Sequence, residues 1–186
     1  MYKLTELKRK AKGNMINKFY HDGKGFKNII FSYENKIMVN ITSFHHESNI
    51  DIKKLWDFFK KENHIDYDNE SKIQVNPYYN SDNVNKFNKL IADNQKDFLL
   101  SDTGITYKQK NKFYKNEVTY KIYKKVHTDE LYKIDASLLD FIDLSKVNLY
   151  VNHSSKNICY ITNNTFDTLG ICIMQPFDKC ELLDLL

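Results

Sequence analysis

The clearest pattern of apolar and polar residues lies in the last third of the chain. It predicts four strands there, over residues 131–134, 147–151, 158–161 and 169–174. In the second of these, every other residue is apolar while Asn148 falls on the opposite face, which is typical of a half-buried antiparallel strand. Asp135 follows the first strand and can cap a helix over residues 136–142, because its carboxylate can accept unpaired N–H groups of the first turn.

The first part of the chain shows a shorter series of the same elements. The spacing of apolar residues predicts a helix, a hairpin, a second helix and a strand, over residues 4–11, 26–44, 52–62 and 66–75. The hairpin turns at residues 34–36. Pro77 and the polar residues 80–83 then interrupt the pattern, which predicts a domain boundary between residues 76 and 77.

Beyond that boundary the elements return in a longer form. A helix and three strands precede the C-terminal elements, over residues 83–92, 98–100, 104–107 and 118–122. The chain is therefore expected to be α+β, with antiparallel sheets and short helices on one face. Its expected parts are an N-terminal domain over 1–76, a C-terminal domain over 77–179 and a leucine-rich tail over 180–186.

The last predicted strand closes on Met174, Gln175, Pro176 and Phe177. This ending, together with the predicted helix before it, resembles the C-terminal half-domain of bacterial and phage sliding clamps, the ring-shaped processivity factors of DNA polymerases. The resemblance is strongest over residues 131–177. Clamps of this type end their last strand with Ile-Met-Pro-Met, whereas here Gln175 separates Met from Pro and Phe177 stands in the place of the second Met. The resemblance implies clamp-like half-domains.

The resemblance also implies a dimeric or trimeric ring around duplex DNA, whose inner helices contact phosphates without reading bases. The first three predicted helices carry basic residues suited to this, whereas the fourth exposes Asp140 and Asp143. The same faces are also typical of solvated helices in a lysine-rich chain. The candidate DNA-binding residues are Lys8, Arg9, Lys10, Lys12, Lys53, Lys54, Lys60, Lys61, Lys86 and Lys89.

In sliding clamps the closing segment lines a pocket that receives short peptides from polymerases. The matching positions here are Met174, Pro176 and Phe177, although a last strand simply buried in its sheet explains them equally. The leucine-rich tail resembles the peptides that clamps bind, with Leu182 in the place of the usual Gln. Packing of the tail on the protein itself or on another copy is the alternative. The candidate residues of the tail are Leu182, Leu183, Leu185 and Leu186.

Composition limits the class of protein. The 186 residues suit one large domain or two small ones, and 41% hydrophobic residues with 12 Phe and 13 Tyr can form a core. The three cysteines provide no disulfide framework, and no signal peptide or membrane span is expected. The net charge of +4 is more basic than is typical of sliding clamps, whose outer surface is usually acidic. The Asn, Lys, Ile and Tyr bias is typical of A/T-rich coding DNA, which fits a low-GC bacterium or its phage. Without an expected signal peptide or membrane span, the protein is expected in the cytoplasm of such a bacterium or of one infected by a phage.

Catalytic patterns are weak in this sequence. It has no glycine-rich phosphate loop and no nucleophile elbow, and the neighbouring His45 and His46 would point to opposite faces of a strand. Asp66, Asp68 and Glu70 alternate on one predicted strand and leave open a Mg²⁺-dependent nuclease, although solvated acids are the commoner explanation. We expect no enzyme, and therefore no catalytic residues, metal or cofactor.

The sequence thus predicts a non-catalytic sliding-clamp-like replication protein that encircles or cradles duplex DNA and tethers a DNA polymerase or another replication protein. The alternative is a phage-encoded interaction protein that binds and inhibits a host replication or defence complex. Deleting residues 182–186 separates the two hypotheses, because it would abolish partner binding under the second and leave ring assembly intact under the first.

A ring predicts that the purified protein has a solution mass two or three times its chain mass of 22.2 kDa. Light scattering coupled to size exclusion, over a concentration series, measures this mass. A monomer at every concentration would exclude an encircling ring and would favour the alternative.

Overall fold

The structure is a computed structural model that describes residues 3–11, 18–21, 29–33, 36–40, 89, 91–92, 96–110, 116–153 and 156–183. The chain divides into two compact units, Met1–Asn94 with Phe141–Asp143, and Gln95–Asp140 with Leu144–Leu186. Most of the described residues lie in antiparallel strands, with a few short helices, so the fold is α+β. The predicted boundary between residues 76 and 77 lies outside the described residues and stays a prediction.

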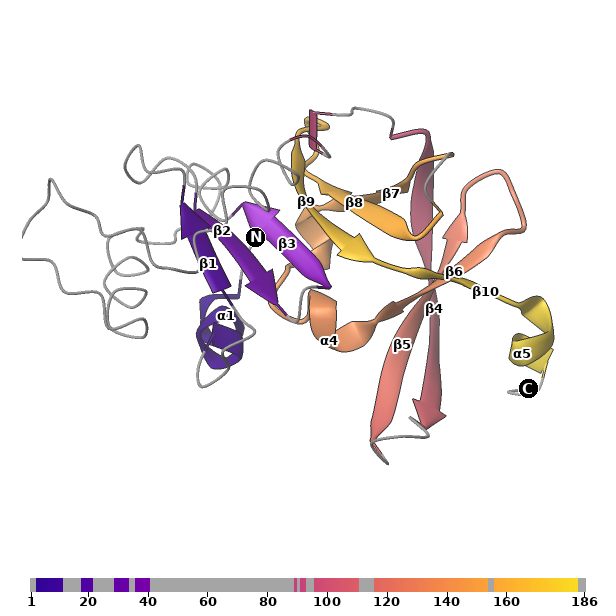
Figure 1. Cartoon of the computed structure of the whole chain (residues 1–186). Helices are drawn as coiled ribbons and strands as arrows, with labels where there is room; N and C mark the ends of the chain where they lie inside the picture. Colours follow the sequence, from indigo (N-terminus) through magenta and orange to yellow (C-terminus); the bar gives the residue numbers. More distant parts are fainter. Residues whose placement is uncertain are drawn as a thin grey trace, which may run out of the picture. The chain divides into compact units, whose positions relative to one another are not determined.

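The first unit contains one helix and a three-stranded antiparallel sheet among its described residues (Figure 1). These elements are α1 (Leu4–Ala11), β1 (Lys18–His21), β2 (Ile29–Tyr33) and β3 (Ile37–Asn40), with β2 between the other two strands. The helix predicted over residues 4–11 and the predicted hairpin are both confirmed. Leu7, Ile37 and Val39 are almost completely buried, because Ile37 and Val39 share one face of β3 and apolar residues recur at helical spacing along α1.

The second unit is a seven-stranded antiparallel sheet in the order β9-β8-β7-β4-β5-β6-β10. Figure 1 shows β4 and β5 as its longest arrows. The strands are β4 (Phe98–Lys110), β5 (Glu117–Lys125), β6 (Leu131–Asp135), β7 (Asn148–Val151), β8 (Ile158–Thr162), β9 (Thr168–Ile173) and β10 (Gln175–Phe177). The short helices are α4 (Ala136–Leu139), the 3-10 helix η2 (Leu144–Lys146) and α5 (Lys179–Leu183).

The four C-terminal strands predicted from alternation are confirmed to within one residue at each end. The capped helix is also confirmed, since the Asp135 carboxylate accepts a hydrogen bond of 2.9 Å from the backbone N–H of Ser137. The helix is shorter than expected, however, and ends at Leu139. Phe141 and Ile142 lie beyond it in a turn and are 0% and 1% exposed, so they are buried outside the helix rather than on its face.

Strand β4 is continuous where the sequence predicts two strands, over residues 98–100 and 104–107. The pairing of β4 with β5 shifts between Asp102 and Thr106, so the chain forms a β-bulge and continues. Gly104 adopts a φ of +74°, its N–H donates to the Asp102 carboxylate at 2.8 Å, and the Thr103 hydroxyl donates to the Ile122 carbonyl at 2.7 Å. The glycine therefore marks a bulge and does not end the strand.

The core of the second unit includes a row of register partners on one face of the sheet, and adjacent residues of β6 and β8 are buried on both faces. Leu100, Leu149 and Ile161 are register partners across β4, β7 and β8, and all are at least 95% buried. Cys159 and Cys172 are partners across β8 and β9, and both are buried free thiols, as expected of cysteines that act as small apolar residues. Burial, followed by the neighbouring Cys172, raises the pKa of the Cys159 thiol.

Replacing Gly104 with Ala should destabilise the protein by about 1–2 kcal/mol, because an L-residue is strained at this positive φ. A Cβ at this position would meet no atom within 4 Å, so the cost is conformational and not steric. Urea unfolding measures the change. Gly104→Asn is the matched control and should lose less stability, since Asn tolerates this backbone region better. Equal losses in the two variants would contradict the conformational explanation.

Candidate nucleic-acid interface

The basic residues of helix α1 differ in their exposure to solvent. Arg9 is exposed and its Nε lies 2.8 Å from Glu6 Oε2, one turn earlier. Lys10 is only 5% exposed, and its Nζ lies 4.3 Å from the centroid of the Tyr33 ring. Lys10 therefore does not lie on an exposed helix face, contrary to the expectation, because an aromatic ring of β2 covers its ammonium group. The side chain of Lys8 and all of Lys12 lie outside the described residues.

The other predicted DNA-binding lysines are mostly outside the described part of the chain. Lys89 has helical backbone and is exposed, as a phosphate contact requires. For the rest, DNA contact stays a prediction; they are Lys53, Lys54, Lys60, Lys61 and Lys86. The turn after α4 exposes Asp140, as the sequence suggests for the acidic end of that helix.

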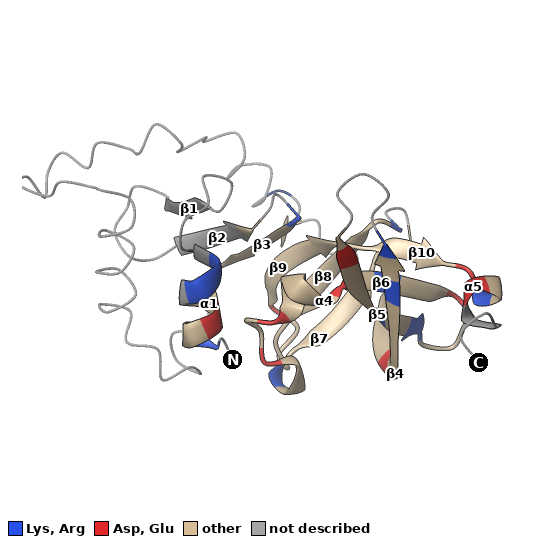
Figure 2. Cartoon of the chain, turned by 90° about the horizontal axis from the view of Figure 1, so that it is seen from below, with Lys and Arg blue, Asp and Glu red and all other residues tan. Residues whose placement is uncertain are grey.

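The structure brings a different basic surface together, on the hairpin of β4 and β5. Residues 103–125 contain seven lysines and one glutamate. Lys108, Lys110 and Lys121 fall on one face of the hairpin, which we call the lysine face. Lys108 lies 3.8 Å from Glu117 and Lys121 lies 3.9 Å from Asp102, but these pairs are largely exposed and weak. Figure 2 shows basic segments on α1 and in the region of β5 and β6.

The opposite face of the hairpin is aromatic and holds a buried lysine. Tyr107 and Tyr120 are register partners with ring centroids 6.4 Å apart. The Nζ of Lys133 lies 5.4 Å and 5.2 Å from these two centroids, and it donates a 3.3 Å hydrogen bond to Gln109 Oε1. The side chain of Lys133 is only 8% exposed. We call this group, with Phe177, the Lys133 cluster.

The Lys133 cluster decides which face of the hairpin can meet a nucleic acid. Its rings already surround a cation of the protein itself, and the attraction between ammonium and ring strengthens when both are withdrawn from water. Tyr107 and Tyr120 are therefore half-buried and engaged with Lys133. The lysine face is left exposed, and its ammonium groups can contact phosphates.

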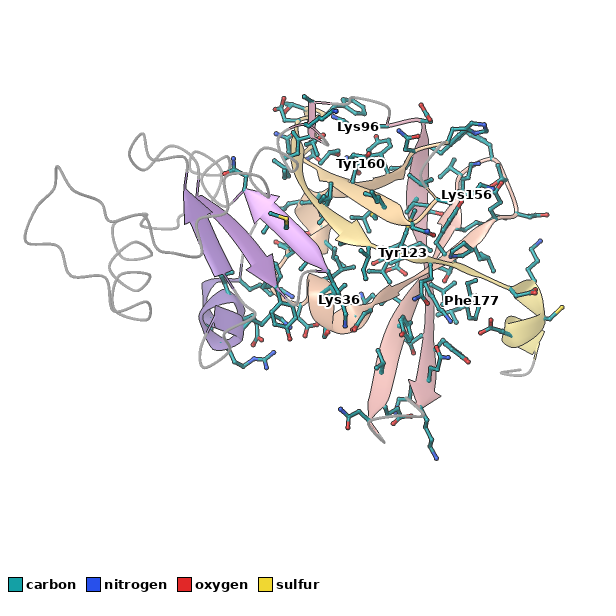
Figure 3. All side chains as sticks on the ribbon, viewed as in Figure 1. Lys36, Lys96, Tyr123, Lys156, Tyr160 and Phe177 are labelled. Carbon is teal, nitrogen blue, oxygen red and sulfur yellow. The ribbon has the colours of Figure 1, made fainter. Side chains whose placement is uncertain are left out.

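The residues expected to bind a partner peptide divide into buried and exposed ones. Met174 and Phe177 are 2% and 5% exposed, whereas Pro176 is exposed. Phe177 contributes to the Lys133 cluster, with its ring centroid 5.2 Å from that of Tyr107 and 5.6 Å from Lys133 Nζ (Figure 3). Strand β10 pairs with β6 at the edge of the sheet, where a proline costs no ladder hydrogen bond. These positions fit a last strand buried in its sheet, and peptide binding stays a prediction.

The leucine-rich tail begins as helix α5, whose backbone includes Leu182 and Leu183. The Asp178 carboxylate accepts the Cys180 N–H at 3.0 Å, Lys179 lies 3.2 Å from Asp129, and Glu181 lies 3.9 Å from Lys133. Hydrogen bonds from Lys124 and then Lys179 lower the pKa of the Asp129 carboxyl. Leu185, Leu186 and the side chains of the other two leucines lie outside the described residues.

Sequence reasoning missed the two buried lysines of this unit. Lys125 is 7% exposed, with its Nζ 3.9 Å from the Phe98 ring centroid and 3.4 Å from Glu130 Oε1. The Tyr132 hydroxyl also donates to Glu130, at 2.7 Å, and this bond is the main cause that lowers the pKa of the Glu130 carboxyl. The sequence signal for these buried lysines was that Lys alternates with Tyr and Phe on neighbouring strands. Strands exposed to solvent show the same alternation, so it does not indicate burial.

No group of three His, Cys, Asp or Glu side chains gathers as a metal site within the described residues. His45, His46, Asp66, Asp68 and Glu70 lie outside that part of the chain. The described helices include none with the length and apolar character that a membrane crossing needs.

Replacing Phe177 with Ala should destabilise the protein by about 3 kcal/mol, because a large buried ring is removed from the Lys133 cluster. Pro176→Ala is the matched control on the same strand and should change stability by less than about 0.5 kcal/mol, since Pro176 is exposed. Urea unfolding measures both values. A Phe177→Ala variant as stable as the wild type would contradict the structural role of the ring.

Comparisons with known protein families, with curated proteins and with solved structures find no match. The likeness to sliding clamps therefore depends on the sequence pattern of residues 131–177.

Proposed function

We propose that this chain is a non-catalytic DNA-binding protein that contacts the duplex backbone through the lysine face of the β4–β5 hairpin. The observation that carries the proposal is the lysine face itself, on which Lys108, Lys110 and Lys121 lie together within a segment, residues 103–125, that contains seven lysines and one glutamate. Lysines that neutralise phosphates release condensed counterions, which supplies most of the free energy of non-specific DNA binding. The chain's net charge of +4 is smaller than the excess on this hairpin alone, so positive charge is concentrated there.

The geometry of the hairpin supports contact with a duplex. A two-stranded antiparallel ribbon fits the major groove, which is about 12 Å wide. Lys108 and Lys110 are alternate residues of β4, so their Cα atoms are about 7 Å apart on the same face. That face also carries Thr106, Lys121 and Glu117, and its lysines can contact phosphates once they leave their exposed ion pairs with Glu117 and Asp102.

The finer proposal is a sliding-clamp-like replication protein in the bacterial cytoplasm. It acts as a dimer or trimer that encircles or cradles duplex DNA and tethers a polymerase. Its support is the sequence likeness over residues 131–177 and the antiparallel α+β fold in which Asp135 caps a helix directly after β6. In this proposal the polymerase peptide meets the exposed Pro176 at the sheet edge.

The alternative is an interaction protein that binds and inhibits a host replication or defence complex through its tail. Helix α5 at the start of the tail is held to the body of the second unit by Lys179 with Asp129 and by Glu181 with Lys133. Both ion pairs precede the recognition peptide of residues 182–186, so they leave this alternative open.

Lys108→Glu and Lys110→Glu should each weaken binding to a labelled duplex at low salt. Each variant should also reduce the slope of log K against log salt concentration by about one, because one phosphate contact is lost. Fluorescence anisotropy at several salt concentrations measures both quantities. Lys146→Glu is the matched control, since Lys146 is an exposed lysine of the same unit outside the hairpin, and it should leave the slope unchanged.

The same titration compares the hairpin with the helix that the sequence predicts. If affinity for the duplex falls only in the variant in which Glu replaces Lys53, Lys54, Lys60 and Lys61, the interface lies on that helix and not on the hairpin. Binding that no variant weakens would overturn the proposal of DNA contact through either surface.

A further inference from the structure

Strand β4 has an edge that no described strand covers beyond the bulge. Its neighbours in the sheet are β5 and β7. On one edge β4 pairs with β5 as far as Lys110, whereas on the other it pairs with β7 over Phe98–Leu100 alone. Figure 1 shows the ends of β4 and β5 extending beyond the other strands of the second unit. Within the described residues, one edge of β4 is therefore unpaired over residues 106–110.

The pairing register decides which backbone groups point toward this edge. In an antiparallel ladder, opposite residues alternate between bonded and non-bonded pairs, so successive residues of a central strand bond to one neighbour and then the other. The Lys125 N–H donates to the Glu130 carbonyl, just before β6, at 3.0 Å. The Val126 N–H donates to the Leu99 carbonyl of β4 at 2.9 Å. Odd-numbered residues of β5 therefore bond toward β6, and even-numbered ones bond toward β4.

Beyond the bulge, three residues of β4 present their backbone groups to the unpaired edge. Tyr107 and Gln109 are register partners of Tyr120 and Val118, which are even-numbered, so these two residues bond to β5. The N–H and C=O groups of their alternate neighbours point the opposite way. These neighbours are exposed, lie on the lysine face, and are called here the β4 edge; they are Thr106, Lys108 and Lys110.

The bulge differs from the β4 edge because side chains satisfy its backbone. The Gly104 N–H donates to Asp102 Oδ1 at 2.8 Å, and the Ile105 N–H donates to Thr103 Oγ1 at 3.2 Å. In the part of the chain that the structure describes, no side chain accepts from the N–H groups of the β4 edge. The β4 edge thus offers three N–H donors and three C=O acceptors in the arrangement that a further strand requires.

The β4 edge is also held in position by the Lys133 cluster on the opposite face of the hairpin. The Tyr107 ring centroid lies 5.2 Å from that of Phe177, and Gln109 Oε1 accepts a hydrogen bond of 3.3 Å from Lys133 Nζ. Both contacts come from residues that alternate with those of the β4 edge. A strand held in this way loses less conformational freedom when a partner binds.

The charge of the β4 edge distinguishes between possible occupants. If two copies of this chain paired through it, their lysine faces would lie side by side, and like charges across strands are destabilising. Lysines on an edge strand oppose such self-pairing. Carboxylates on an added strand would instead lie beside Lys108 and Lys110. The pair of Lys108 with Glu117, at 3.8 Å, is exposed and involves β5, so it leaves this side of β4 open.

We propose that the β4 edge binds an extended segment of a partner protein, which adds to the sheet as an antiparallel strand with acidic residues at alternate positions. Hydrogen bonds to the backbone of Thr106, Lys108 and Lys110 hold the segment, and its carboxylates beside the two lysines select it. The segment binds whether or not the lysine face contacts DNA. Where the lysine face does contact DNA, the segment competes with the duplex, because its carboxylates occupy the positions of the phosphates.

The test titrates the isotope-labelled full-length protein with the acetylated and amidated peptide Glu-Val-Glu-Val-Thr and follows the amide NMR signals. In antiparallel register the two glutamates and the threonine lie opposite Lys110, Lys108 and Thr106. We expect saturable shifts of these three amides, and slower exchange of their hydrogens with solvent in the complex. The amides of Tyr107 and Gln109 should exchange slowly with and without peptide, because they bond to β5.

Two methylated peptides separate strand addition from attraction between charges alone. N-methylation of both glutamates and the threonine removes the N–H groups that face β4 and should weaken binding at least about tenfold. N-methylation of the two valines removes N–H groups that face solvent and should weaken binding less than about threefold. The two peptides carry the same charge. Equal affinities would show that the lysines only attract acidic groups, and would overturn the proposal.

Protein variants test the preference for acidic residues. Replacing both Lys108 and Lys110 with Gln should weaken peptide binding at least about threefold, because two cross-strand charge pairs are lost. Both side chains are exposed, so the variant should fold. Lys146→Gln is the matched control, since Lys146 is an exposed lysine of the same unit outside the hairpin, and it should leave the affinity unchanged. Equal affinity in the double variant and the wild type would contradict selection by charge.

The same spectra identify the other possible occupants. Amides of the β4 edge that exchange more slowly at higher protein concentration, before any peptide is added, would identify a second copy as the occupant. Slow exchange at every concentration would mean that another part of the same chain covers the edge. Either result, or the absence of saturable shifts up to the solubility limit of the peptide, would overturn the proposal.

Discussion

The second unit depends on the way strand β4 serves two neighbours. It pairs with β7 over Phe98–Leu100 and with β5 from Leu100 to Lys110, so the strand passes from the core into the hairpin. Leu100 pairs with Leu149 on one edge of β4 and with Lys125 on the other, so this strand joins the C-terminal strands to the hairpin. Beyond Leu100 a bulge between Asp102 and Thr106 bends the strand, and Gly104 permits the bulge with its φ of +74°. The core strands and the lysine face are both placed by this one strand.

Buried lysines are the second constraint on this unit. Lys125 and Lys133 are each more than 90% buried, which is unfavourable for an ammonium group without compensation. Aromatic rings and nearby carboxylates provide that compensation, and in doing so they tie β5 and β6 to β4, β10 and α5. The Glu130 carboxyl beside Lys125 has a lowered pKa, so its contribution is present above the ordinary carboxyl pKa and is lost as the pH falls through the lowered one.

These constraints bear on function by separating the two faces of the hairpin. One face is closed by the Lys133 cluster and the tail helix, and the other is left to solvent with an excess of lysine. A protein that binds DNA without reading its sequence needs such a rigid support more than it needs a pocket, because phosphate contacts depend on charge and spacing. The fold does not decide the activity, which belongs to the exposed surface.

The sequence by itself determined the local elements of the described chain. Helix α1, the hairpin of β2 and β3, the C-terminal strands and the Asp135 cap were all predicted, because alternation, helical spacing and capping depend on residues close together in the chain. The bulge at Gly104 was missed, since a glycine in a strand pattern can mark either a break or a bulge.

The tertiary structure alone decided which basic residues are exposed and which polar groups lack partners. Lys10, Lys125 and Lys133 are buried because rings from other strands cover them, and no property of a lysine within its own strand or helix foretells this. The Tyr123 hydroxyl has no hydrogen-bond partner among the described residues, whereas the Tyr132 hydroxyl on the adjacent strand donates to Glu130, although the residue type is the same. Local sequence sets the direction of a side chain, but only long-range packing decides what it meets there.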